Sequence, residues 1–296
     1  MMALDTTDCK RPIPPIGLMA VLNVTPDSFS DGGLLASKDD LLQAAQGAIC
    51  VANQHQLPLF WLDVGGESSR PGAAFVSESQ ELARILPAIE ALTVAFPETN
   101  ISIDTRRAAV AQAALRAGAS IINDISAGQD DPQMFALAAK SGATLVLMHS
   151  TVVADEPQNP WPIVLGHLKQ QFSKAMDAGV LARQLWLDPG FGFGKSVQQN
   201  MRMLADASPI MTLAQALGCQ GVVMGSSRKS FLTQRPYQEA ANALPPSQRD
   251  YLTAASLVPL IQAAIGINCP MQLRVHHVSA MADVLSLLKA CEDLLF

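Results

Sequence analysis

Eight short apolar runs in the sequence each end in a polar side chain that could take part in chemistry. These polar residues are Asn23, Asp63, Asp104, Asn123, His149, Asp188, Ser226 and His276. A single Asp or Asn in such a place usually caps the next helix or starts a turn. Capping does not explain why eight runs end alike, and the carboxyl ends of neighbouring parallel strands meet on one side of a barrel. The pattern therefore predicts one polar pocket built from residues far apart in the sequence.

Two segments and one strand end carry groups that bind phosphate. The segment 65–72 offers glycine N–H groups, hydroxyls and an arginine, and the segment 225–230 offers similar groups at an expected helix start. Arg274 and His276 alternate along the last run, so their side chains share one face of the expected strand. The net charge of the chain is −6, so an anionic substrate needs a local cluster of cations such as this one.

The sequence FGFGKS at 191–196 looks like the end of a P-loop, which binds nucleotide phosphates. That motif requires a glycine at position 189, where this chain has Pro189. We interpret the segment instead as a loop between a strand and a helix that places Phe191 and Phe193 over the pocket.

The apolar runs that must position these residues are separated by helical segments. The runs cover 17–24, 59–66, 101–105, 121–126, 144–150, 185–190, 221–227 and 271–278. Continuous apolar runs favour strands that are covered on both faces, as in a parallel sheet. Eight strand–helix units in 296 residues predict the α/β class and a (β/α)8 TIM barrel. A doubly wound open sheet alternates in the same way, but it would place GxGxxG after the first strand, and this chain has NVTPDSFSDGG there.

Helix ends are also readable in the sequence. Ser77 with Gln80 predicts a capping box, and Asp131 before a proline predicts an N-cap. Ser37 precedes two acidic residues, which favour a helix start, and Gly118 and Gly142 are expected to end two helices. No linker or low-complexity stretch divides the chain, so residues 1–296 are expected to form a single barrel domain, with 1–15 as a flexible N-terminal lead.

Composition limits the class of protein. With 49% hydrophobic and 16% charged residues the chain can bury a large core, and its negative charge argues against nucleic acid or an anionic membrane as partner. Five scattered cysteines and an N-terminus without an apolar stretch predict a cytoplasmic location. The uncharged segment 251–273 is interpreted as a barrel helix followed by a strand, not as a membrane span. Its apolar surface predicts a homodimer contact.

The motifs taken together resemble one known family. NVTPDSFSDGG, DVGGESSRPG, SIDT, IINDIS, LMH, DPGFGFGK, GSSRKS and RVH occur in the order seen in the dihydropteroate synthases, which are pterin-binding TIM barrels. The resemblance covers residues 17–278. It implies an enzyme of folate biosynthesis, a Mg²⁺-dependent transferase that joins 4-aminobenzoate to 6-hydroxymethyl-7,8-dihydropterin diphosphate and releases pyrophosphate. Sulfonamides compete with the aminobenzoate in that family.

Roles are carried over where a motif matches. The resemblance implies that pterin is bound by Asp104, Asn123, Asp188 and Lys229. It assigns the diphosphate to Asn23, Ser69, Arg70, Arg274 and His276, and the aminobenzoate to Ser69, Phe193 and Ser230. Asn23 would also bind Mg²⁺, and the residues expected to drive catalysis are Asn23, Arg70, Arg274 and His276. Asp31 and Asp63 could order the first two loops around the ion.

Some positions depart from the family pattern. Ser69 stands where Thr is usual, Ser150 where Met is common, and His277 where Asp is usual. By alternation along the strand His277 should point away from Arg274 and His276, so the change is expected to affect a supporting role. Arg106, with its neighbour Arg107, is interpreted as part of a solvated helix face.

Two alternatives remain open at this point. A methyltetrahydrofolate–corrinoid methyltransferase shares the barrel and the Asp and Asn contacts to pterin, but it has no need of a pyrophosphate site. A pterin-binding paralogue without synthase activity would keep the motifs and act as a scaffold or regulator.

Overall fold

The computed structural model describes residues 15–24, 37–68, 75–154, 159–234 and 244–295. In these residues eight parallel strands close into a barrel in chain order, which confirms the predicted fold class. The strands are β1 (Ile16–Asn23), β2 (Phe60–Gly65), β3 (Asn100–Asp104), β4 (Ile121–Asp124), β5 (Thr144–Met148), β6 (Leu185–Asp188), β7 (Gly221–Met224) and β8 (Met271–Val275). The barrel closes where Ile16 of β1 pairs with Met271 of β8.

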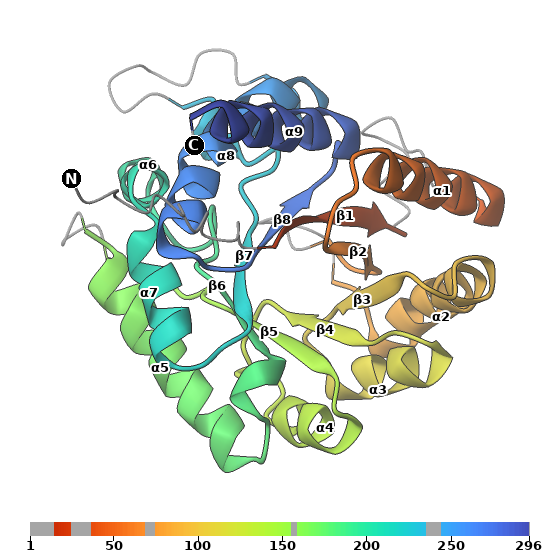
Figure 1. The fold of residues 1–296 in the computed structure, drawn as a ribbon. Coiled ribbons are helices and arrows are strands. Elements are labelled where there is room, and N and C mark those ends of the chain that lie inside the picture. Colours follow the sequence, from red (N-terminus) through yellow and green to blue (C-terminus); the bar gives the residue numbers. More distant parts are fainter. Residues whose placement is uncertain (1–14, 25–36, 69–74, 155–158, 235–243, 296) are drawn as a thin grey trace, which may run out of the picture.

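Helices surround the strands on all sides (Figure 1). The α-helices are α1 (Lys38–Gln54), α2 (Glu78–Ala95), α3 (Ala108–Ala117), α4 (Gln133–Ser141), α5 (Trp161–Asp177), α6 (Val197–Ala205), α7 (Ser208–Ala216), α8 (Asp250–Ile267) and α9 (Val278–Leu295). Short 3-10 helices are η2 (Ala182–Gln184), η3 (Ser230–Leu232) and η4 (Pro246–Arg249). Every observed strand begins within one residue of the start of an expected one. Every observed strand also ends before the expected one, because the polar residues at the end of each run belong to a loop.

The predicted helix ends are largely confirmed. Ser77 and Gln80 form the capping box of α2, and Gly118 and Gly142 end α3 and α4 in the left-handed conformation. The expected N-cap at Asp131 is wrong by one residue, because Pro132 holds that position. The Asp131 carboxylate still accepts the backbone N–H of Gln133 at 3.1 Å, so it satisfies one of the unpaired groups at the start of α4.

The interior of the barrel is built in layers, because every second residue of a strand points inward. One layer is apolar and buried, and it consists of Met19, Trp61, Ile121, Val146, Trp186 and Val223. The Trp61 and Trp186 rings meet edge to face, with centroids 5.0 Å apart. Two residues further along the strands, the inward positions are Asp63 on β2, Asn123 on β4 and Asp188 on β6, all buried. An apolar plug therefore supports a polar layer at the carboxyl ends of the strands.

Among the described helices, α8 has the length and composition of a membrane span. In the fold it is a barrel helix, and its Leu257, Leu260 and Ile261 are buried in the core that joins helices to strands. Its outer side is exposed at Tyr251 and Pro259 and carries no charged side chain from Tyr251 to Ile267. The interpretation of this segment as a barrel helix is confirmed.

Candidate active site

The first four strands bring residues at their carboxyl ends into one row. The register sets Asn23 of β1 beside Gly65 of β2, Gly65 beside Asp104 of β3, and Asp104 beside Asn123 of β4. Gly65 keeps this row open, because a Cβ atom there would lie 3.4 Å from Asn23 Oδ1 and 3.7 Å from Asp104 Oδ2. Side chains that the sequence separates by up to a hundred residues thus share one edge of the barrel mouth.

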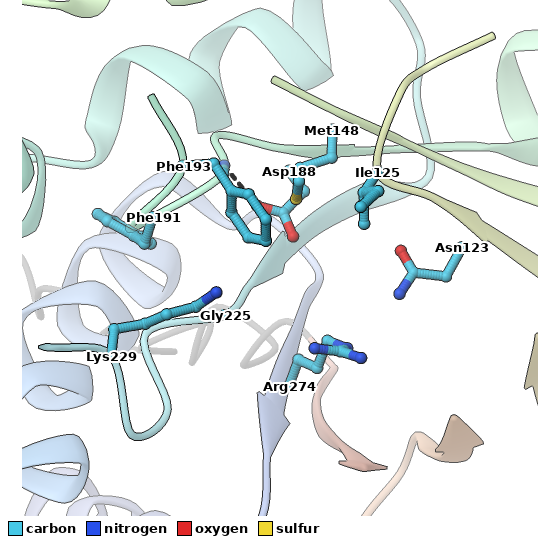
Figure 2. A pocket seen from close by; sticks show the side chains of 10 residues that line it. Asn123, Ile125, Met148, Asp188, Phe191, Phe193, Gly225, Lys229 and Arg274 are labelled. Carbon is cyan, nitrogen blue, oxygen red and sulfur yellow. Dashed lines mark hydrogen bonds between the residues drawn. The ribbon is translucent and has the colours of Figure 1, made fainter. Parts of the chain in front are cut away.

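A pocket lies between this row and the ends of β5 to β8. It holds about 320 Å³, part of which is open to solvent, and it is lined by Asn123, Ile125, Met148, Asp188, Gly190, Phe191, Phe193, Gly225, Lys229 and Arg274. In Figure 2 the polar ends of Asn123, Asp188, Lys229 and Arg274 point toward one space from different strands and loops. The sequence prediction of a shared polar pocket is therefore correct for these four residues.

Arg274 occupies the floor of the pocket and binds two carboxylates. Its Nε donates to Asp63 Oδ2 and its Nη2 to Asp104 Oδ2, both at 2.7 Å. Burial by itself lowers the pKa of Arg274, but Asp63 and Asp104 outweigh burial and raise it, so the guanidinium stays charged. Burial raises the pKa of Asp104, and Arg274 opposes that shift. The floor is thus a buried ion network rather than a set of separate groups.

Asp63 is the anchor of this network. Besides Arg274 it accepts the Ser102 hydroxyl at 2.6 Å and the Asn123 side-chain amide at 3.3 Å, and it has no exposed surface. The family resemblance suggested that Asp63 could order the first two loops around Mg²⁺. In the structure its contacts fix Asn123 and Arg274 in the orientation in which both line the pocket.

Asp188 lines the pocket from the end of β6. Its Oδ1 accepts the backbone N–H of Gly190 at 2.7 Å. Burial raises the pKa of Asp188 to about 6, while the hydrogen bond from Gly190 and the charges of Arg274 and Lys229 oppose the rise. Gly190 has a φ of 68°, and a Cβ on it would lie 1.9 Å from the carbonyl oxygen of His149. Only glycine fits where the chain turns to hold Asp188.

The loop after β6 covers one side of the pocket. The Lys229 ammonium lies 3.9 Å from the centre of the Phe193 ring, a cation–π contact between two predicted site residues. Phe191 is buried and stacks on Phe231 with ring centroids 6.4 Å apart. The expectation that Phe191 and Phe193 lie at the pocket is confirmed.

His276 and His277 follow β8 and point in different directions. His276 Nδ1 lies 2.9 Å from the hydroxyl of Ser227, which follows β7. His277 is exposed, and its Nδ1 accepts the backbone N–H of Ala280 at 3.3 Å at the start of α9. His277 thus caps a helix, a task that the usual Asp also performs well, and this confirms that the substitution touches a supporting role.

Two of the eight polar strand ends were wrongly assigned to the pocket. His149 and Ser226 are buried on the helix side of the barrel: the His149 ring contacts His167 of α5, and the Ser226 hydroxyl lies 2.9 Å from that of Ser256 of α8. Strand alternation explains the error, because the preceding residue of β5, Met148, is the one that points inward.

Three further interpretations need correction. Arg107 is not part of a solvated face: it donates to Glu67 at 2.8 Å, to the buried Glu81 and to the carbonyl of Val76. The arginine of the segment 225–230, Arg228, is bound to Asp250 by two hydrogen bonds of 2.8 Å and is not placed to hold a phosphate. The helix expected to start at the segment 225–230 is the three-residue η3, so it supplies little of the dipole that would attract an anion.

Several residues that line the pocket were not predicted from the sequence. Ile125 follows Asn123 by two residues and Met148 follows the inward Val146 by two, so period-two counting along the two strands would have found both. Ser230 is exposed at the start of η3, beside Lys229. Ser69 and Arg70, like Asp31, lie outside the described residues.

Comparisons with known proteins agree on one family. The family model described as "Pterin binding enzyme" matches residues 19–276. A dihydropteroate synthase of Streptococcus pyogenes serotype M6 is 40% identical over 273 residues, which cover 92% of this chain and 94% of the relative. The chain belongs to the dihydropteroate synthase family. The motif-based resemblance is thereby confirmed.

Solved structures of this family have the same fold and bind ligands. The Yersinia pestis dihydropteroate synthase in a sulfonamide drug complex superposes with a TM-score of 0.78 at 33% identity, and 95% of each chain is covered. The Xanthomonas albilineans dihydropteroate synthase in complex with 7,8-dihydropteroate gives 0.73 at 32% identity, over 95% of this chain and 94% of the other. The barrel, the pocket and the sequence thus agree on one synthase family.

Proposed function

We propose that the pocket joins 6-hydroxymethyl-7,8-dihydropterin diphosphate to 4-aminobenzoate, giving 7,8-dihydropteroate and pyrophosphate in folate biosynthesis. The observation that carries this proposal is the convergence of Asn123, Asp188, Lys229 and Arg274 on one pocket. Membership of the dihydropteroate synthase family supports the same reaction. Neither a corrinoid methyltransferase nor an inactive paralogue is favoured by any observation on the described residues.

The pterin is read by hydrogen bonds at fixed strand ends. A pterin edge presents ring N–H and amino donors next to carbonyl and ring nitrogen acceptors. The Asp188 carboxylate is suited to accept two donors, while the Asn123 amide and the Lys229 ammonium can satisfy acceptors. Because Asp63 and Gly190 fix Asn123 and Asp188 in advance, little ordering is required when the pterin binds.

The reaction breaks the C–O bond between the exocyclic methylene and the diphosphate, whose oxygen keeps the electron pair. The amine nitrogen of 4-aminobenzoate then forms the C–N bond and releases a proton. Stabilising the departing negative charge is the main electrostatic task. We assign it to Arg70, Arg274 and His276, with Asn23 and Ser69. Arg274 has donors beyond the two bound to Asp63 and Asp104, so it can contact the diphosphate without leaving the floor.

Mg²⁺ fits the donors of this site. Among the described residues no group of three His, Cys, Asp or Glu forms a metal cage, but Mg²⁺ usually takes one or two protein oxygens with substrate phosphates and waters. Asn23 Oδ1 borders the open space above Gly65, with Asp104 on the other side. We therefore infer that Asn23 binds the ion, which would neutralise diphosphate charge when bound.

The second substrate is assigned to the outer part of the pocket. Phe193, held over Lys229, offers an aromatic face to the ring of 4-aminobenzoate, and Ser230, which follows Lys229 in the chain, offers an exposed hydroxyl. Ser69 completes this proposed subsite. A sulfonamide would compete for the same place, in keeping with the drug complex of the Yersinia pestis relative.

We also propose a cytoplasmic homodimer. The homodimer is supported by the outer side of α8, where Tyr251, Ala255, Pro259 and Gln262 are exposed and uncharged. An uncharged helix side of this length on a protein surface is a typical subunit contact.

The pterin assignment is tested by calorimetric titration of the pterin diphosphate in the presence of Mg²⁺. Asp188→Asn replaces a two-fold acceptor by a mixed donor and acceptor, which should cost about 2 kcal/mol, or roughly thirty-fold in affinity. Asp130→Asn serves as the matched control, since Asp130 is half exposed and pairs with Arg106 outside the pocket. Equal affinity in the wild type and the Asp188 variant would contradict the assignment.

A further inference from the structure

Lys195 makes an unusual set of contacts at the end of the loop 189–194, between β6 and α6. Its Nζ lies 2.9 Å from the carbonyl oxygen of Gly190, 2.9 Å from that of Phe193 and 3.3 Å from that of His149. An ammonium has three N–H donors, and the three backbone carbonyls match them in number. The lysine of the FGFGKS segment thus binds its own loop and the end of β5.

The three carbonyls belong to two walls of the pocket. Gly190 and Phe193 begin and end the turn that covers the pocket, and His149 follows Met148, which lines the pocket from the neighbouring strand, beside Asp188. One half-buried lysine side chain therefore joins the end of β5 to the loop after β6. Burial lowers the pKa of Lys195 to about 7, with the negative charge of Asp188 opposing the shift. The enclosure of this side chain accounts for the direction of the shift.

The position of this loop determines what surrounds Lys229. The Phe193 ring covers the Lys229 ammonium at 3.9 Å, and a Cβ on Gly192 would lie 3.0 Å from Lys229 Cδ. Other hydrogen bonds secure the loop at separate points, from the Gly192 N–H to Asn200 at 2.7 Å and from the Val153 N–H to the Gly194 carbonyl at 2.7 Å. The carbonyls of Gly190 and Phe193, at the two ends of the turn, both accept hydrogen bonds from Lys195.

We propose that Lys195 is a positioning residue that holds Phe193 in place for the second substrate. The proposal rests on the proposed function in so far as Phe193 contacts the 4-aminobenzoate ring. Lys195 acts through the loop and not on substrate, because its donors are directed to backbone oxygens. Loss of the ammonium leaves the Phe193 carbonyl without its side-chain donor. The Gly190 carbonyl then keeps only the Phe193 N–H at 3.1 Å, so the turn that carries Phe193 is held less firmly to the end of β5. Asp188 keeps its own hydrogen bond from the Gly190 N–H and its place at the end of β6.

The first experiment is a steady-state comparison of Lys195→Met with wild type. Methionine keeps most of the volume and removes the charge and the donors. We expect the KM for 4-aminobenzoate to rise about tenfold and the KM for the pterin diphosphate to change by less than about threefold, a split of about 1 kcal/mol between the substrates. Lys195→Arg, which can again donate to several carbonyls, should recover part of the loss. Lys140→Met, at an exposed site on α4, is the matched control and should leave both values unchanged.

The second readout is hydrogen–deuterium exchange of the peptide that covers 189–196, and it does not depend on synthase activity. In Lys195→Met this peptide should exchange at least about tenfold faster, while peptides from β2 and β3 keep wild-type rates. If Lys195→Met does not fold, Lys195→Gln, which keeps an amide donor, is measured in the same way. Unchanged exchange in the loop, or an equal rise in both KM values, overturns the proposal. Wild-type protein without synthase activity refutes the proposed function instead, and the exchange result still decides the role of Lys195 in the loop.

Discussion

Asp63 and Asp188 are both buried carboxylates near the carboxyl ends of their strands, yet their partners give them different tasks. Asp63 accepts hydrogen bonds from Ser102, Asn123 and Arg274, so both of its carboxylate oxygens are already bound to donors within the protein. Asp188 accepts one N–H from Gly190 and lines the pocket. We therefore assign Asp63 to the support of the site and Asp188 to the ligand. Each of the two is an acidic residue that follows an apolar run, so the sequence alone does not distinguish their roles.

Removal of Asp63 should cost stability. Asp63→Ala leaves the largely buried Arg274 with one carboxylate fewer, and breaking such a buried pair lowers the free energy of unfolding by about 3 kcal/mol. Asp130→Ala breaks a pair with Arg106 in which Asp130 is 49% exposed, and we expect less than about 1 kcal/mol. Urea denaturation monitored by tryptophan fluorescence gives both values. Similar costs at the two positions would refute the role of Asp63 as an anchor.

The pKa of Asp188 predicts how pterin affinity depends on pH. The ionised carboxylate is the form that accepts the pterin N–H groups, and its pKa lies at about 6. Affinity should therefore be constant above pH 7 and fall as the pH decreases, to roughly a tenth at pH 5. In Asp188→Asn this transition should be absent. The test is calorimetry from pH 5 to pH 8, and a wild-type affinity independent of pH would count against the assignment.

The raised pKa of Asp188 also affects the stability of the fold, and its pH dependence is opposite to that of pterin affinity. The fold raises the pKa of Asp188 above its ordinary value of 3.8, so the native state binds the proton more tightly than the unfolded state. This group's contribution to stability is present at low pH and is lost as the pH rises from about 4 to about 6. Conditions that favour ligand binding are thus those in which this carboxylate least favours folding, as is common for residues kept for function.

At the scale of the elements, strand beginnings could be predicted and strand ends could not. Apolar runs mark where a strand enters the core, as at Thr144 and Leu185, where prediction and structure coincide. At the carboxyl ends the polar residues belong partly to strands and partly to loops, and the runs do not show where pairing stops. Strict period-two counting would have placed His149 and Ser226 on the helix side, because Met148 and Gly225 take the inward positions.

The turn after β6 should tolerate no side chain at its first glycine. Gly190→Ala forces a Cβ against the His149 carbonyl and requires a left-handed alanine, so we expect a loss of about 2 kcal/mol or more and weaker pterin binding. Gly166→Ala in α5 is the control, since a Cβ there meets nothing within 4 Å and alanine favours a helix. Thermal unfolding compares the two. A harmless Gly190→Ala would show that this turn is not needed to hold Asp188.

Across the whole molecule, the features that the sequence did not reveal are those that depend on barrel closure. Arg274 of β8 reaches Asp63 of β2 and Asp104 of β3, partners that are separated by most of the chain. Closure sets β8 beside β1, so these residues become neighbours only when the ring is complete. The family motifs indicated which residues share the site, whereas their pairing required the register of the strands.

The outer side of α8 predicts the state of assembly. Ala255→Arg places a charge in the middle of the exposed, uncharged surface and should convert a homodimer into a monomer in sedimentation velocity runs. Ala136→Arg, at an exposed position of α4, should leave the assembly unchanged. A wild-type protein that sediments as a monomer would remove the proposed contact.

The most direct test of the account is product formation by the purified full-length protein. With 6-hydroxymethyl-7,8-dihydropterin diphosphate, 4-aminobenzoate and Mg²⁺, we expect 7,8-dihydropteroate and pyrophosphate in equal amounts, and no dihydropteroate when any one of the three is omitted. Asp188→Asn should lower kcat/KM for the pterin diphosphate by about thirty-fold. A folded wild-type protein that binds the pterin diphosphate and yields neither product would contradict the proposed reaction.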